Sequence, residues 1–187
     1  MLIERTNLPS PAPPYSHLSP GCATLAASIR ERCYGSREVW PPGDAVGVDA
    51  GVAVKANLPF KERRGLVLLD PAYEDGKDWQ RTGRAISDAV ERMANTVVLA
   101  WYPLKKEADA DGLKADVAAL NVPGSLAVEL LVREPFAEGG LAGSGLVVVN
   151  PPYMLKAELD VLLPLLAERL GVGQWGRGSV KVLTPPR

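Results

Sequence analysis

The stretch GLVLLDPAYE, residues 65–74, sets a continuous apolar run directly before an Asp-Pro pair. An apolar run bounded by glycine and Asp-Pro is typical of a fully buried parallel strand. Further runs of this kind follow at 96–102, 125–132, 146–150 and 179–183, and helical patterns occupy 78–94, 105–120 and 154–170. This succession predicts a doubly wound α/β sheet. A glycine-rich connection at 134–145 joins two of the strands and predicts an antiparallel edge on the parallel core.

The first quarter of the chain follows a different pattern. Residues 1–20 are rich in proline, which predicts a loop or an arm without any core element. Residues 22–33 favour a short helix, and VAVKANL (52–58) favours a short helix or strand that ends at Pro59. The sequence therefore divides into a proline-rich segment, 1–48, and an α/β part, 49–187.

Composition limits the classes of function. The 187 residues suit one domain, and 47% hydrophobic with 23% charged residues indicates a globular protein. The net charge of −1 leaves only a local basic patch for binding a polyanion. The run Lys61–Arg64 is the densest candidate, although a solvated loop before the strand is the more common explanation of such a run.

Few residues suit a metal or a membrane. A single histidine and two cysteines without CxxC spacing argue against a metal centre and a disulfide framework, so we expect no metal. Glu74, Asp75 and Asp78 lie too close along a loop to form a convincing metal site. No apolar stretch reaches the roughly 18 residues of a membrane span, and the N-terminus does not resemble a signal peptide. We expect a reduced, cytoplasmic setting with no membrane partner.

The tetrad Asp70-Pro71-Ala72-Tyr73 follows the first strand, where ligands bind in such sheets. The Asp70 carboxylate can accept one N–H of a planar exocyclic amine, and the Pro71 carbonyl can accept the other. Two acceptors favour a pyramidal nitrogen whose lone pair can attack a methyl group, and the carboxylate can take the departing proton. Tyr73 offers a face for an unstacked base. Strand-Asp-Pro is also a common way to begin a turn, so both readings stay open on these residues alone.

Four blocks resemble a known family when they are taken together in order. They are DAGVAVKANLPFKERRG (49–65), the overlapping RRGLVLLDPAYE (63–74), WYPL (101–104) and GSGLVVVNPPYML (143–155). They resemble the 23S ribosomal RNA adenine-N6 methyltransferases called RlmJ, a family that older descriptions connect with catabolism of external DNA. The resemblance covers about residues 49–187 and implies a Rossmann-like, S-adenosyl-L-methionine-dependent methyltransferase fold.

The resemblance also implies roles for individual residues. Asp70 takes the position of the catalytic aspartate of the family's Asp-Pro-Pro-Tyr motif, and Pro71 and Tyr73 carry over with it. Asp49 falls on the acid that helps to bind the cofactor, within Asp49-Ala50-Gly51 in place of an Asp-Gly pair, so cofactor contacts are expected from Asp49, Ala50 and Asp70. Ala72 replaces the second proline, which loosens the turn.

The N-terminal segment departs from the family. Residues 1–48 show no glycine-rich cofactor loop, the element that normally cradles a nucleotide-like ligand. We therefore expect a fold that is incomplete at its N-terminus, and activity that is impaired if the cofactor-binding half is missing.

Asn150-Pro151-Pro152-Tyr153 has the form of an amino-methyltransferase tetrad by itself. We interpret it as a strand-ending turn because X-Pro-Pro forces an extended exit, with Tyr153 packing on the next helix or lining a nucleic-acid groove.

Two other segments offer weaker candidates. GSG at 143–145 lacks the lysine and the helix of a P-loop. Tyr102 borders the pocket or, on the simpler reading, packs in the core.

The sequence thus predicts methylation of an adenine N6 amino group in 23S ribosomal RNA that is protein-free or at an early stage of assembly, by a monomer. The alternatives are a non-catalytic nucleic-acid-binding remnant that uses Lys61–Arg64, with salt-sensitive affinity, and a role in the use of external DNA.

Overall fold

The structure, a computed structural model, describes residues 22–27, 50–61, 63–105, 107–134 and 140–186. Its strands are β1 (Cys22–Ala27), β2 (Arg64–Leu69), β3 (Val97–Leu104), β4 (Leu126–Leu131), β5 (Gly143–Val149) and β6 (Arg177–Val182). Its helices are α1 (Ala50–Asn57), α2 (Asp78–Arg92), α3 (Glu107–Ala119) and α4 (Leu155–Leu170). The elements predicted from residue 65 onward are confirmed, with ends that differ by a few residues.

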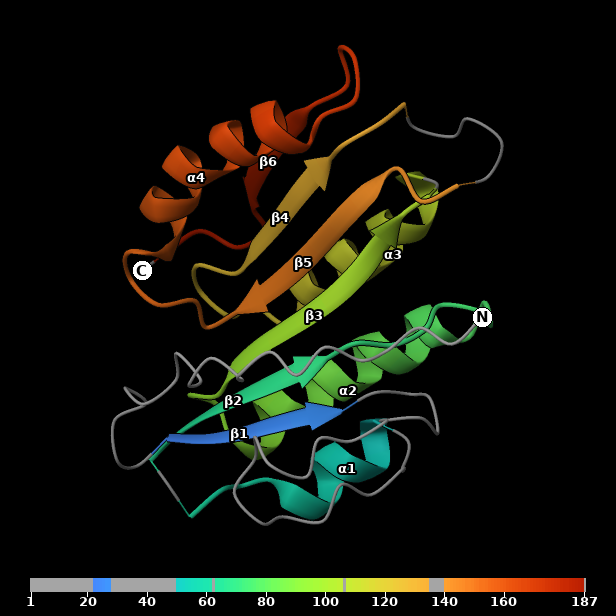
Figure 1. Cartoon of the computed structure of the whole chain (residues 1–187). Helices are drawn as coiled ribbons and strands as arrows, with labels where there is room; N and C mark the ends of the chain where they lie inside the picture. The colour runs from blue at the N-terminus through green and yellow to red at the C-terminus, as the bar shows by residue number, and fades with distance from the viewer. Residues whose placement is uncertain (1–21, 28–49, 62, 106, 135–139, 187) are drawn as a thin grey trace, which may run out of the picture.

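One mixed sheet organises the described residues, with strand order β1-β2-β3-β5-β4-β6 (Figure 1). The strands β1, β2 and β3 are parallel, and Leu69 of β2 lies opposite Ala100 of β3. The strands β5, β4 and β6 continue the sheet in antiparallel pairings. The predicted antiparallel edge is therefore confirmed, and it extends over three strands. Because β5 runs antiparallel to β3, the carboxyl end of β5 lies at the opposite end of the strands from the carboxyl ends of β1, β2 and β3.

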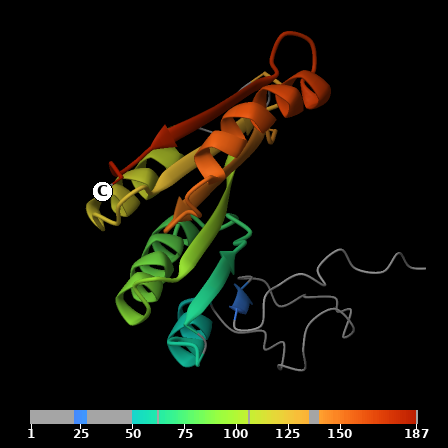
Figure 2. The ribbon, with the colours of Figure 1, turned by 90° about the vertical axis from the view of Figure 1, so that its left-hand side faces the viewer.

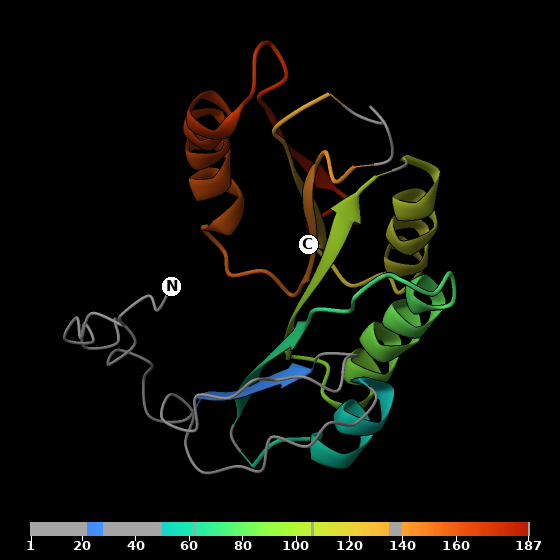
Figure 3. The ribbon, with the colours of Figure 1, turned by 45° about the vertical axis from the view of Figure 1, so that its right-hand side comes forward.

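Helices cover the two faces of the sheet unequally. Figure 3 shows α1, α2 and α3 on one face and α4 alone on the other, over the antiparallel strands. Figure 2 shows the same two layers after a quarter turn. The larger core lies under the first three helices and includes Val67, Leu69, Ile86 and Tyr102. A smaller core lies under α4 and is formed around Leu126, Val128, Val148 and Leu163.

The apolar positions of α2 and of the residue after it confirm the helix predicted over 78–94. Ile86 and Met93 are buried in the larger core, and Trp79 and Val90 pack against it. The spacing of these residues follows the period of 3.6 residues per turn, so that one face meets the sheet.

Two predictions of secondary structure are wrong. Residues 22–27, expected to begin a helix, form β1, because pairing with β2 overrides the helix preference of an alanine-rich segment. The predicted connection 134–145 is shorter than expected, because Gly143 and Gly145 already belong to β5. A Cβ at Gly145 would collide with the Tyr102 ring, so glycine here allows a side chain from β3 to cross β5.

Candidate active site at the end of β2

Asp70 directly follows the last residue of β2, at the carboxyl edge of the parallel strands. Asp70 is exposed, and no hydrogen bond or ion pair joins its carboxylate to the rest of the described chain. Pro71, the next residue, is buried. An exposed carboxylate beside a buried proline is thus held at the place where ligands bind in sheets of this kind.

Tyr73 differs from the expected open stacking surface. Its side chain is 7% exposed, and its ring centroid lies 4.3 Å from that of Trp79 and 6.0 Å from that of Trp101. Its hydroxyl donates a hydrogen bond of 2.9 Å to the backbone carbonyl of Trp101. The expectation of a free face is therefore wrong for this structure, because aromatic neighbours and the β3 backbone already engage the ring and the hydroxyl.

The backbone of Tyr73 is unusual as well. Its φ of 51° lies in the left-handed region, which a bulky residue rarely adopts. Residues in such conformations persist where the surrounding structure holds them, often at functional sites. Burial raises the pKa of the Tyr73 hydroxyl, and the charges of Asp78 and Asp70 add to the effect, so this hydroxyl stays protonated at neutral pH.

The acidic residues that follow the tetrad fix the loop. The Asp78 carboxylate accepts hydrogen bonds from the Asp75 backbone N–H at 3.3 Å and from Arg81 Nη1 at 3.2 Å. The Asp75 carboxylate accepts the Lys77 backbone N–H at 3.0 Å. The side chain of Asp78 therefore binds back to the loop, and no side-chain hydrogen bond caps the start of α2.

A polar network next to this site was missed by the sequence analysis. Tyr102 is fully buried, and its hydroxyl donates to Glu129 Oε1 at 2.9 Å, while Lys114 Nζ lies 2.6 Å from the same oxygen. The simpler expectation, that Tyr102 packs in the core, is thus confirmed. Burial alone would lower the pKa of Lys114, but the hydrogen bond and charge of Glu129 outweigh it and raise the pKa. No sequence signal announced this network, because its members come from α3, β3 and β4.

The second tetrad, Asn150–Tyr153, lies at the other end of the strands from Asp70. Val149, the last residue of β5, pairs with Val98 near the start of β3, whereas Asp70 follows Leu69, which pairs with Ala100 in the middle of β3. The Asn150 side-chain amide donates to the carbonyls of Ala94 and Thr96 at 2.8 and 2.9 Å. Asn150 therefore closes a strand-ending turn, as predicted.

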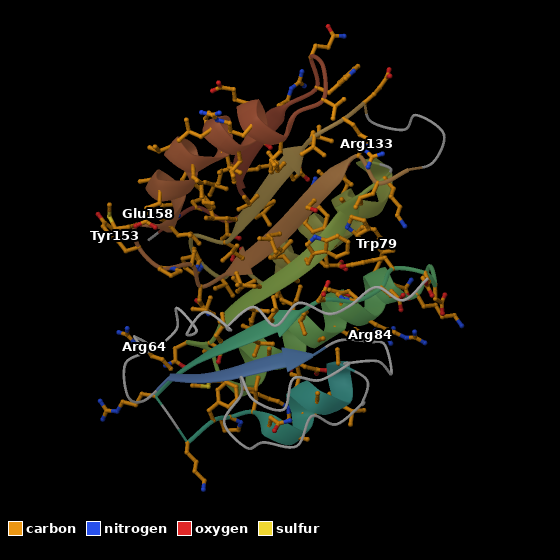
Figure 4. All side chains as sticks on the ribbon, in the orientation of Figure 1. Arg64, Trp79, Arg84, Arg133, Tyr153 and Glu158 are labelled. Atoms are coloured by element: carbon orange, nitrogen blue, oxygen red, sulfur yellow. The ribbon has the colours of Figure 1, made fainter. Side chains whose placement is uncertain are left out.

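Tyr153 lies beyond that turn and does not pack on α4. It is 97% exposed and lies two residues before Leu155, the first residue of α4 (Figure 4). The prediction that it packs on the following helix is wrong.

The basic run is also distant from Asp70. Lys61 and Arg63 are exposed and precede β2, and Arg64 is its first residue, at the end opposite Asp70. Figure 4 shows Arg64 and Trp79 at opposite sides of the sheet. Six residues of strand separate the two ends by roughly 20 Å. Any contact of this run with nucleic acid would thus involve a different part of the ligand from the group held at Asp70.

Asp49 and Ala50 are both expected to contact the cofactor. Asp49 lies outside the described residues. Ala50 is the first residue of α1 and is buried, so its methyl group faces the core. The first N–H groups of a helix lack intrahelical partners and favour anionic groups, so a contact from Ala50 to a cofactor would involve its backbone.

A comparison with protein families shows which family this chain belongs to. Residues 45–184 match the family described as ribosomal RNA large subunit methyltransferase D, RlmJ. The chain belongs to this family. The match includes Asp70 and its neighbours as well as the whole antiparallel part of the sheet, which confirms the resemblance of the four sequence blocks and a Rossmann-like mixed α/β fold.

Two individual relatives carry names that agree with this family. The chain is 37% identical over 135 residues to ribosomal RNA large subunit methyltransferase J of Haemophilus influenzae, and 32% identical over 132 residues to the Escherichia coli protein of the same name. Each alignment covers 71% of this chain and 47% of the relative. The crystal structure of protein LPL1258 from Legionella pneumophila aligns with a TM-score of 0.66 at 26% identity, over 73% of this chain and 50% of that one. The chain thus spans about half the length of the relatives that it matches.

None of the helices among the described residues combines the length and apolar character that crossing a bilayer requires.

Proposed function

We propose that this chain provides the target-amine end of an active site that methylates the N6 amino group of an adenine in 23S ribosomal RNA. The observation that carries the proposal is the exposed Asp70 carboxylate, which the rest of the described chain leaves unengaged at the carboxyl end of β2. Membership of a family of ribosomal RNA methyltransferases supports the class of reaction.

Asp70 and Pro71 would activate the amine. The nitrogen lone pair of an exocyclic amine is delocalised into the ring, so the free amine is a poor nucleophile. Hydrogen bonds from its two N–H groups to the Asp70 carboxylate and to the Pro71 carbonyl would favour a pyramidal nitrogen. As the new N–C bond forms, the nitrogen loses a proton, and the Asp70 carboxylate can accept it.

Tyr73 would act mainly as a positioning residue. The bond from its hydroxyl to Trp101 and its contact with Trp79 support a role in fixing the Asp70–Pro71 loop. The sequence predicts that an unstacked base lies on this ring, and that role would require Trp79 to move away. An adenine within a duplex would also have to leave its stack before reaching Asp70.

The methyl donor would be S-adenosyl-L-methionine, which supplies an electrophilic methyl group on a sulfonium sulfur. The residues present fit this group in part. Asp70 is open to a ligand, and the backbone N–H of Ala50 begins α1. The role of Asp49 rests on the resemblance.

The test compares Asp70→Asn with Asp160→Asn in a methyl-transfer assay on a 23S ribosomal RNA fragment. Asp160 is an exposed acid on α4, paired with Lys156 at 2.7 Å. We expect the rate to fall by roughly 10²–10⁴-fold with Asp70→Asn, the usual contribution of an acid–base group, and to remain unchanged with Asp160→Asn. An unchanged rate in Asp70→Asn would overturn the mechanism.

Two binding measurements separate the alternatives. Calorimetry with S-adenosyl-L-methionine reports whether the chain holds the donor, and salt-dependent RNA binding without donor binding or transfer would favour a non-catalytic nucleic-acid-binding role. Competition between RNA and DNA of equal sequence reports whether the substrate is the RNA proposed here or external DNA.

A further inference from the structure

The outward face of α4 is apolar. Val161 is 68% exposed, Leu162 is 47% exposed and Leu165 is 55% exposed, and Val172 just beyond the helix is 66% exposed. The helix forms the outermost described layer on its side of the sheet (Figure 3). Contiguous exposed apolar side chains of this kind mark interaction surfaces more often than chance exposure does.

The exposed residues form a stripe with a charge at each end. With 3.6 residues per turn, Glu158, Leu162, Leu165 and Arg169 fall on one side of the helix. Leu163 and Ala167 lie on the side that faces the sheet and are buried. We call Glu158, Leu162, Leu165 and Arg169 the α4 stripe.

The order of residues in the α4 stripe is symmetric about its centre. Leu162 and Leu165 are equally far from the point between Leu163 and Pro164, and so are Glu158 and Arg169. In an antiparallel pair of α4 helices related by a two-fold axis through this point, Leu162 of one copy would face Leu165 of the other. Glu158 would likewise face Arg169, which gives a self-complementary interface.

Charge explains why the partner is a second copy. Glu158 and Arg169 are eleven residues apart on one helix, about 16 Å along its axis, too far to pair within a chain. Neither forms an ion pair within the part of the chain that the structure describes. A second α4, running the opposite way, would provide each with an opposite charge and would cover the leucines between them.

We propose that the α4 stripe is a self-association surface on which a second copy of this chain docks through antiparallel α4 helices. Sixteen-residue helices of about 24 Å form a small interface, at the low end of stable complexes. The dimer is therefore reversible and depends on concentration, which departs from the monomer expected from the sequence. This surface is independent of Asp70 and of the proposed methyl transfer.

Sedimentation velocity of the full chain, from low to high micromolar concentration, tests the pairing. We expect the average mass to rise toward twice that of the monomer. Glu158→Arg and Arg169→Glu should each weaken dimerisation about tenfold, because each places like charges opposite one another at two positions. The double variant E158R/R169E restores the opposite charges and should return dimerisation to the original level.

Two further variants separate the pairing from non-specific effects. Glu168→Arg makes the same charge reversal about 100° around the helix from Arg169. Its symmetric mate, Leu159, packs toward the sheet, so dimerisation should not change. Leu165→Gln removes an apolar contact from an exposed position that folding does not need, and it should abolish dimers. A chain that stays monomeric throughout, or a double variant that does not recover, overturns the proposal and leaves the stripe to a different partner.

Discussion

The hydroxyl of Tyr73 donates a 2.9 Å hydrogen bond to the backbone carbonyl of Trp101, joining the loop after β2 to the neighbouring strand β3. This bond connects the proposed catalytic tetrad to β3, a central strand of the sheet. It also helps to hold Tyr73 at a φ of 51°. The position of Asp70 three residues earlier therefore depends on a contact that lies outside the tetrad.

Tyr73→Phe tests that dependence. The change leaves the ring in place and removes the donor to Trp101, so the free energy of unfolding should fall by about 1–2 kcal/mol, and the proposed methyl transfer should slow with it. Urea unfolding measures the first effect. Tyr153→Phe is the matched control, because Tyr153 is almost fully exposed, and its stability should stay within about 0.5 kcal/mol. Equal stability of the two variants would contradict a structural role for the bond.

Asn150→Asp distinguishes the two tetrads. The amide of Asn150 donates to two carbonyls, and a carboxylate cannot donate to either, so we expect a loss of about 2–3 kcal/mol in unfolding free energy. Asn57→Asp is the control, since the amide of exposed Asn57 makes one bond, to Ala53 at 2.8 Å, and its loss should cost about 1 kcal/mol or less. A gain of methyl transfer in Asn150→Asp would show that the second tetrad acts chemically.

Gly145→Ala tests the crossing of Tyr102 over β5. The added methyl group would meet the Tyr102 ring, which is fully buried. We expect a loss of about 2–4 kcal/mol in thermal or chemical unfolding. Gly112→Ala in α3 meets nothing within 4 Å and should instead stabilise by about 0.5–1 kcal/mol. Similar effects in both variants would contradict the predicted collision.

Stability should decline at alkaline pH. Burial raises the pKa of Tyr73 and of Tyr102 above the ordinary value of 10.0, and Glu129 adds to the effect at Tyr102. Above pH 10, the unfolded chain loses these protons before the folded chain does, so stability falls as pH rises through that range and is retained below it. The raised pKa of Lys114 acts in the same direction.

Unfolding measured from pH 8 to pH 11 should therefore show a steep decline that begins near the ordinary tyrosine pKa of 10.0. In Tyr102→Phe the decline should be shallower, because one of the titrating groups is gone. A decline of the same steepness in this variant would mean that Tyr102 is not among the groups responsible.

The sequence alone determined the order of elements from residue 65 onward, because each apolar strand and amphipathic helix is a local pattern. It also located Asp70 at a strand end and the turn at Asn150, because proline restricts the backbone locally. Four blocks in order were enough to indicate the RlmJ family.

Tertiary structure decided the rest. Residues 22–27 form a strand because β2 offers them a partner, and the ring of Tyr73 is buried because Trp79 and Trp101 come from other elements. The Tyr102–Glu129–Lys114 network joins residues from three elements, and the separation of Arg64 from Asp70 follows from the direction of β2. In each case the deciding contact lies between residues far apart in the chain, so no pattern within a short segment encodes it.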